Sequence, residues 1–161
     1  LLSLDIKAAH SSLNRPRARE AITQATPSLL PWVDPWLRTR STYSLRAGEF
    51  VEGSRGVDQG DPLSALIFAL ALDPALRVIK EAGKLKDARS EILAYADDCY
   101  LLGSPEAVLE MYHHLPETLK VLDLSLAPQK RTIWARESEA MPTNTLHRIT
   151  EAVVLNTYVG T

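Results

Sequence analysis

The hydrophobic positions fall into short runs separated by polar segments, prolines and glycines. The apolar run at residues 1–6 predicts a short buried strand, and a segment of small and polar residues follows it. Residues 17–26 have a proline on either side and predict a short helix. Three prolines and two tryptophans in residues 27–37 indicate turns and a broken helical segment, and residues 41–53 predict a hairpin.

A long apolar stretch predicts a helix that begins at Pro62. Asp61 can accept hydrogen bonds from the first turn, and proline suits the first helical position. We expect this helix to run to about Lys80 and to end before Gly83. It is apolar almost all round as far as Leu76, which predicts a buried, central position.

The second half of the chain contains a further hairpin, a further helix and late strands. The stretch "EILAYADDCYLLGS" (residues 91–104) has two apolar arms around a polar centre, and Ser104 can cap a helix with apolar positions every three or four residues. Residues 132–134 and 153–159 predict late strands. This order of elements favours an α+β fold, a mainly antiparallel sheet with helices on one face.

Composition and charge limit the possible functions. The chain has 161 residues, 45% of them hydrophobic and 24% charged, as expected for one globular domain. We find no apolar run near the roughly 20 residues of a membrane helix, so no membrane partner is expected. The single cysteine, Cys99, excludes an internal disulfide and favours a reduced, intracellular compartment.

The net charge of −2 is unusual for a stand-alone nucleic-acid binder, because phosphate contacts normally require a basic surface. A chain of this charge that acts on nucleic acid would be catalytic, with acidic residues on metal ions, or part of something larger. The first residues, "LLSLDIKAAH", begin in the middle of a strand, and the last, "AVVLNTYVGT", stop inside a hairpin. We therefore expect both ends to be cut.

Carboxylates stand at the ends of two predicted strands. Asp97 and Asp98 lie between the arms of the later hairpin, and Asp5 ends the first strand. If these strands are neighbours, the three carboxylates converge, and they stay ionised together only when cations neutralise them. Oxygen ligands without His or Cys suit Mg²⁺ or Mn²⁺, and an ion pair about 3.5–4 Å apart serves phosphoryl transfer in polymerases and nucleases. An Asp-Asp hairpin is otherwise an ordinary solvated turn.

Gln59 and Gly60 stand directly before the cap of the long helix. A glycine lets another group approach the main chain closely, and the glutamine amide offers a donor and an acceptor beside it. This pair suits a surface for a base pair or a ribose. An ordinary glycine turn before a capped helix explains the same residues.

Five stretches, in this order, resemble the palm motifs of reverse transcriptases: "LSLDIKAAHSSLNR", "RGVDQGDPLSALIFALALDPAL", "AYADDCYLL", "LDLSLAPQKRTIW" and "VVLNTYVGT". The second is most similar to non-LTR (LINE-like) retrotransposons. The resemblance implies a polymerase palm with a ferredoxin-like core over residues 1–161, with residues 15–54 as a partial fingers-like insertion and no thumb. It also implies RNA-templated DNA synthesis, in which dNTPs are added to a DNA primer with the help of two metal ions, Mg²⁺ or Mn²⁺. The expected location is intracellular, nuclear or cytoplasmic, in the ribonucleoprotein of the retroelement.

The resemblance assigns roles residue by residue. The catalytic aspartates, which also hold the metal ions together with a backbone carbonyl of Ile6, are Asp5, Asp97 and Asp98. The residues expected around the incoming nucleotide are Ala8, Ala9, His10, Gln59, Gly60 and Lys130. The residues expected beside the primer terminus are Tyr95 and Ala96.

Two positions depart from the family pattern. His10 stands where the family usually has the Phe or Tyr that excludes a 2′-hydroxyl, and Ala127 replaces the usual Asn of the later motif. The basic fingers strands and the thumb lie outside the sequence, which accounts for its acidic balance. We expect the 161 residues alone to synthesise little or no DNA.

Two other functions fit parts of the pattern. An RNA-templated RNA polymerase usually has a second Asp where His10 stands and a Gly where Ala96 stands, so both positions speak against it. An inactive palm remnant that binds RNA or protein is favoured by His10, whereas the three aspartates speak against it. The remaining candidates have ordinary structural explanations: Arg15, Arg17, Arg19, Arg38, Arg40 and Arg46 as a solvated face, and Trp32 and Trp36 as core or interface residues.

Overall fold

The computed structural model describes residues 1–135, 147–149, 152–154 and 157–159. The strands are β1 (Leu2–Asp5), β2 (Ser41–Ser44), β3 (Phe50–Gly53), β4 (Glu91–Tyr95), β5 (Asp98–Leu102), β6 (Thr132–Ile133), β7 (His147–Arg148), β8 (Ala152–Val154) and β9 (Thr157–Val159). The helices are α1 (Ala9–Ser12), α2 (Arg15–Ala25), α3 (Leu30–Arg38), α4 (Pro62–Lys84) and α5 (Pro105–Lys120), with 3₁₀ turns at Pro27–Leu29 and Arg46–Gly48.

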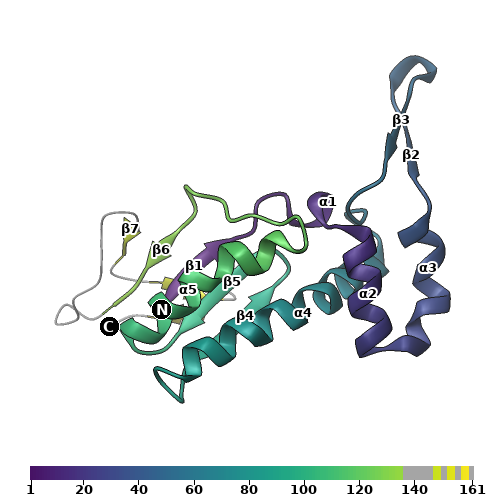
Figure 1. Cartoon of the computed structure of the whole chain (residues 1–161). Helices are drawn as coiled ribbons and strands as arrows, with labels where there is room; N and C mark the ends of the chain where they lie inside the picture. The colour runs from purple at the N-terminus through teal and green to yellow at the C-terminus, as the bar shows by residue number, and fades with distance from the viewer. Residues whose placement is uncertain (136–146, 150–151, 155–156, 160–161) are drawn as a thin grey trace.

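The central sheet has five strands in the order β4-β5-β1-β6-β7. Its pairs are antiparallel except β6 and β7, which run parallel. Strand β1, from the start of the chain, therefore lies between two strands from its second half (Figure 1). This arrangement confirms the α+β prediction of a mainly antiparallel sheet with helices.

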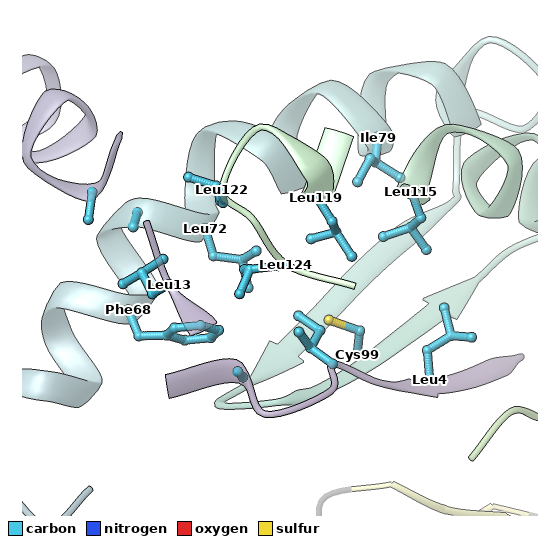
Figure 2. Packing of buried hydrophobic residues seen from close by; sticks show 14 of the residues in the cluster. Leu4, Leu13, Phe68, Leu72, Ile79, Cys99, Leu115, Leu119, Leu122 and Leu124 are labelled. Carbon is cyan, nitrogen blue, oxygen red and sulfur yellow. The ribbon is translucent and has the colours of Figure 1, made fainter. Parts of the chain in front are cut away.

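Helices α4 and α5 pack on each other, α4 also contacts β4, and α5 contacts β5. The core between them and the sheet consists mainly of leucines, with Ile79 and Cys99 among them (Figure 2). Alternate residues of β1 point into this core, so Leu2 and Leu4 are buried while Ser3 and Asp5 are only partly covered. Period-two burial in β1 thus turns Asp5 to the face opposite the leucines.

Residues 27–53 form a segment that projects from the body, which we call the projecting segment. It contains α3 and the β2–β3 hairpin, whose tip extends away from the other elements (Figure 1). The hairpin confirms the prediction for residues 41–53, with Ser41 opposite Gly53 and Ser44 opposite Phe50. The turn predicted in residues 27–37 is present as the 3₁₀ turn Pro27–Leu29. The predicted break in the helical segment is absent, because Pro31 lies in the first turn of α3 and Pro35 is accommodated inside the helix.

Helix α4 begins as predicted, with the Asp61 side chain accepting from the amide of Leu63 at 2.7 Å. It ends at Lys84, so the predicted end before Gly83 is wrong. Gly83 lies within the helix, and its lack of a side chain is explained by close packing against α5. A Cβ at this position would stand 2.6 Å from the Met111 Cγ. The glycine is a close-packing site and not a helix end.

The predicted central position of α4 is confirmed, because the helix contacts α2, α5 and β4, but its burial is incomplete. Leu66, on the side away from the buried Phe68 and Ala71, is 42% exposed, and Val78, beyond the predicted apolar stretch, is 60% exposed. The expectation that no apolar run approaches the length of a membrane span is wrong, because an 18-residue window of α4 has a mean hydropathy of 1.7. By length and composition alone α4 could cross a membrane, which is weak evidence, since a core helix passes the same test.

Three further predictions have definite outcomes. The late hairpin is confirmed for its described residues, since β8 and β9 pair antiparallel with Val153 opposite Tyr158. The prediction that the tryptophans belong to the core is wrong, because Trp32 is 75% exposed and Trp36 is 49% exposed. The assignment of Arg15 to a solvated face is wrong as well, because only 4% of this residue is exposed.

Candidate active site

The pairing of β1 with β5 places Asp5 opposite Asp98. Asp5 is the last residue of β1 and Asp98 is the first of β5, so both stand at the same end of the sheet. Only 13% of the Asp5 side chain is exposed, and Asp98 is partly buried. The predicted convergence of the two strand ends is therefore present in the structure.

Asp97 belongs to the two-residue turn between β4 and β5 and is exposed. Its carbonyl accepts a hydrogen bond from the amide of Ile6 at 2.8 Å, which ties the turn to the end of β1. Ala96, the other turn residue, has a φ of 52°, a left-handed conformation that costs a residue with a Cβ some free energy. Such strain persists only where the surrounding pairing imposes it.

The electrostatics of Asp98 show how closely the carboxylates lie. Burial, followed by the charges of Asp97 and Asp5, raises the pKa of Asp98 above its usual range, and Lys130 acts in the opposite sense. Burial and the same three carboxylates raise the pKa of the adjacent Cys99 thiol to about 12. The site accumulates negative charge that a cation would relieve.

Lys130 supplies one positive charge at this point. Its Nζ donates to the Asp5 Oδ1 at 2.8 Å, although 64% of the lysine side chain is exposed. That hydrogen bond, and after it the charge of Asp5, raises the pKa of Lys130. The lysine expected near the triphosphate thus lies on the first aspartate, beside a cavity of about 260 Å³ lined by Asp5, Lys7, Ala8 and Lys130 among others.

The donor chemistry of the three aspartates suits a hard divalent cation, since all their ligand atoms are carboxylate oxygens. Their mutual repulsion at Asp98 and the attraction of Lys130 to Asp5 are both effects that a bound cation would relieve or replace. In the described part of the chain, no three His, Cys, Asp or Glu side chains are already gathered around one point that could hold a metal ion. The three carboxylates are neighbours, and Asp5 accepts a hydrogen bond from Lys130.

Ala8, Ala9 and His10 lie shortly after β1, separated from it by Ile6 and Lys7. Ala8 is exposed and has a φ of 47°, and Ala9 is buried. The His10 ring stacks on Phe68 of α4, with ring centroids 4.9 Å apart and an interplanar angle of 22°. This contact joins the predicted sugar-gate residue to the long helix, which the sequence did not indicate.

Gln59 and Gly60 are both exposed in the turn before α4. Gly60 has a φ of 94°, and a Cβ there would meet no heavy atom within 4 Å. Its need for glycine is therefore conformational, and its surroundings are open to an approaching group.

Tyr95 and Ala96 border a different cavity from the one beside Lys130. It has a volume of about 420 Å³ and lies between α4 and the end of β4, with Phe68, Leu72 and Ala94 in its lining. Tyr95 is 69% exposed at its mouth. The predicted site residues therefore lie around one end of the sheet but line two cavities and an open turn.

Comparison with known proteins agrees with this geometry. The family model for reverse transcriptase (RNA-dependent DNA polymerase) matches residues 1–146. This chain belongs to the reverse transcriptase family. A Pol polyprotein of the retrotransposable element R2 from Bradysia coprophila is 32% identical over 136 residues, and one from Nasonia vitripennis is 30% identical over 135. The alignments cover 79% of this reverse transcriptase chain and only 15% and 13% of those relatives.

These relatives confirm the resemblance to non-LTR retrotransposon enzymes. Among solved structures, apo telomerase from Candida tropicalis matches with a TM-score of 0.63, and telomerase from Candida albicans, in complex with a fragment of telomeric RNA, with 0.67. Each match covers 99% of this chain at 14% sequence identity. It covers 33% of the Candida tropicalis chain and 30% of the Candida albicans chain. At that identity the likeness establishes the fold alone, a reverse transcriptase palm.

Proposed function

We propose that this chain forms the catalytic centre of a retroelement reverse transcriptase, which copies an RNA template by adding dNTPs to a primer 3′-hydroxyl. The observation that supports the proposal most directly is the placement of Asp5 opposite Asp98, with Asp97 in the adjoining turn. A solvated Asp-Asp turn would not require a third, largely covered carboxylate across the sheet. The family match supports the reaction class.

In this proposal Asp5, Asp97 and Asp98 would hold two Mg²⁺ or Mn²⁺ ions, and the Ile6 carbonyl would be a further ligand. When bound, such ions lower the pKa of an attacking hydroxyl and stabilise the departing pyrophosphate. The protein's own contribution is to keep negative charge at one end of a rigid sheet. The Ile6–Asp97 hydrogen bond holds the turn in register for this purpose.

The nucleotide would lie between the end of β1 and the turn before α4. Ala8 and Ala9 would offer backbone amides to its phosphates, and Gln59 and Gly60 an open surface to its base or sugar. Lys130, whose Nζ lies on Asp5 in the structure, would pair with the phosphates. His10, held against Phe68, would stand near the sugar.

The primer terminus would lie at Tyr95 and Ala96, beside the apolar cavity that α4 and β4 form. Residues 15–54 would be a fingers-like insertion that helps to hold the RNA template. Further fingers and a thumb would come from the rest of a longer polypeptide, as the small share of the R2 relatives that this chain covers suggests.

The decisive experiment is Asp97→Asn in a polypeptide that carries this chain with the flanking regions of its relatives. We expect Mg²⁺-dependent primer extension on RNA to fall by at least about 10³-fold, because the amide cannot replace the charge of a metal ligand. Manganese binding, followed by electron paramagnetic resonance, should weaken in parallel. Glu20→Gln, the same chemical change on the exposed face of α2, is the matched control. Extension by Asp97→Asn at the control's rate would refute the metal-ligand assignment.

A further inference from the structure

Arg15 is a buried arginine at the first position of α2. It is 4% exposed, whereas Arg17 on the same helix is exposed and pairs with the exposed Glu20. Burying a guanidinium is costly unless its donors are satisfied, so the surroundings of Arg15 must supply acceptors.

The guanidinium of Arg15 binds oxygens from three separate segments. Its Nε donates to the Gly56 carbonyl at 2.7 Å. One terminal nitrogen donates to the carbonyls of Thr39 at 2.5 Å and Trp36 at 3.3 Å, and the other to the Ser41 hydroxyl at 2.7 Å. All of these acceptors are neutral, so the bonds gain their value from the fixed planar fork of the guanidinium and from the carbonyl end of α3, which favours a cation.

Gly56 connects this cluster to the nucleotide side of the molecule. Its amide donates to the Leu13 carbonyl at 2.8 Å, and the Val57 amide donates to the His10 carbonyl at 2.7 Å. A Cβ at Gly56 would stand 2.5 Å from the Ser11 carbonyl oxygen, and the φ of 72° also favours glycine. The backbone at residues 56–57 therefore lies directly against the segment that follows β1.

A cavity of about 340 Å³ lies beside the cluster, lined by Arg15, Thr39, Ser41, Gly56, Asp58 and Asp61 among others. Open space thus adjoins both the projecting segment and the turn that carries Gln59 and Gly60. Tyr43 also reaches that turn by donating to Asp58, but this contact is exposed. Arg15 provides the buried connection.

We propose that Arg15 is a positioning residue: through Gly56 it fixes the 57–60 turn, and with it Gln59 and Gly60, relative to the end of β1 and the projecting segment. It touches no expected substrate atom itself. Its effect on catalysis rests on the proposed function, whereas its effect on the turn does not.

Hydrogen exchange on the 161-residue chain tests the structural part without any assay of synthesis. In Arg15→Met we expect the amides of Gly56 and Val57 to exchange at least about tenfold faster, with the β1–β5 ladder amides unchanged. Arg17→Met, two residues along the same helix, is the matched control and should leave all of these rates unchanged. Equal rates at Gly56 and Val57 in the two variants would overturn the proposal, and so would a uniform rise that includes the ladder.

Arg15→Lys provides a second variant, which also serves if Arg15→Met does not fold. One lysine nitrogen cannot reach three segments at once, so we expect faster exchange at Gly56 and Val57 here as well. Wild-type exchange rates in Arg15→Lys would overturn the proposal.

Steady-state kinetics in the longer polypeptide of the Asp97 experiment tests the consequence for the reaction. Arg15→Lys should raise the KM for dNTP about tenfold and leave kcat within about twofold, because only the nucleotide surface is displaced. A fall in kcat at unchanged KM would overturn the positioning role. If Asp97→Asn left synthesis intact while the exchange result held, the proposed function would fail and the role of Arg15 in fixing the turn would remain.

Discussion

The carboxylate end of the sheet and the projecting segment use charged and apolar residues in opposite ways. At the sheet end, Asp5 and Asp98 stand on strands whose alternate residues are fully buried, so the core holds the charges in place. In the projecting segment, charges pair with each other, as Arg38 with Asp34, while large apolar side chains are exposed. Six of the twelve exposed large apolar side chains in the described part of the chain belong to this segment: Trp32, Trp36, Tyr43, Leu45, Phe50 and Val51.

This difference shows where the folding free energy resides. The sheet and helices α4 and α5 contribute most of a continuous apolar cluster. The β2–β3 hairpin is held instead by its strand pairing, by the exposed Arg40–Glu52 ion pair and by polar contacts of Ser41 and Tyr43. An isolated two-stranded hairpin is marginally stable in water. We therefore expect substitutions at the sheet to change global stability and substitutions in the hairpin to leave it almost unchanged.

The largest expected effect comes from the core. Leu101→Ala removes a fully buried side chain in β5 and should lower the free energy of unfolding by about 2–5 kcal/mol in urea titrations of the 161-residue chain. Phe50→Ala deletes a larger side chain that is 67% exposed, and should cost less than about 0.5 kcal/mol. Comparable losses in the two variants would contradict the contrast between the regions.

A smaller effect, of opposite sign, is expected at the carboxylates in metal-free buffer. The pKa of Asp98 is raised in the folded state, so folding favours its protonated form. The associated stability is complete below the usual aspartate pKa and is lost as the pH rises through the raised pKa. Asp98→Asn should therefore raise the Tm by a few degrees at neutral pH, and the gain should disappear in acid. Thermal melts across this pH range provide the measurement, and a gain independent of pH would show that charge repulsion is not its cause.

The smallest effect is expected at the ion pair across the hairpin. Arg40 and Glu52 lie 2.9 Å apart with side chains 72% and 58% exposed. Their coupling in a double-mutant cycle of Arg40→Gln and Glu52→Gln should not exceed about 1 kcal/mol and should shrink in added salt. A coupling well above that value would mean that the hairpin depends on this pair.

Features with local signals could be predicted from the sequence. The Asp61 cap and the β2–β3 and β4–β5 hairpins follow from turn residues and strand alternation. The convergence of Asp5 with Asp98 could be predicted only on the condition that their strands are neighbours, and the pairing of β1 with β5 meets that condition. The proposed roles of the site residues depend on the family resemblance, since the geometry shows proximity and not chemistry.

Features that depend on a distant partner could not be predicted in this way. The sequence does not show that Met111 requires a glycine at position 83, that carbonyl and hydroxyl oxygens from three segments bind Arg15, or that Lys130 reaches Asp5. An arginine between Asn14 and Pro16 looks like any solvated helix start. Burial of that kind is decided by tertiary packing, which leaves no periodic signal in the chain.

The close packing at Gly83 has a counterpart at Gly103, where a Cβ would stand 2.9 Å from the Cβ of Ser90. Ser90 and Gly103 flank the base of the β4–β5 hairpin, and Asp97 stands at its tip, roughly 15–20 Å away along the strands. An added methyl group at Gly103 would collide with Ser90 and force the two strands apart at this base, and the φ of 149° adds a conformational cost for any residue with a side chain. The lack of a side chain at Gly103 therefore allows the close pairing of β4 and β5 from which the acidic turn extends.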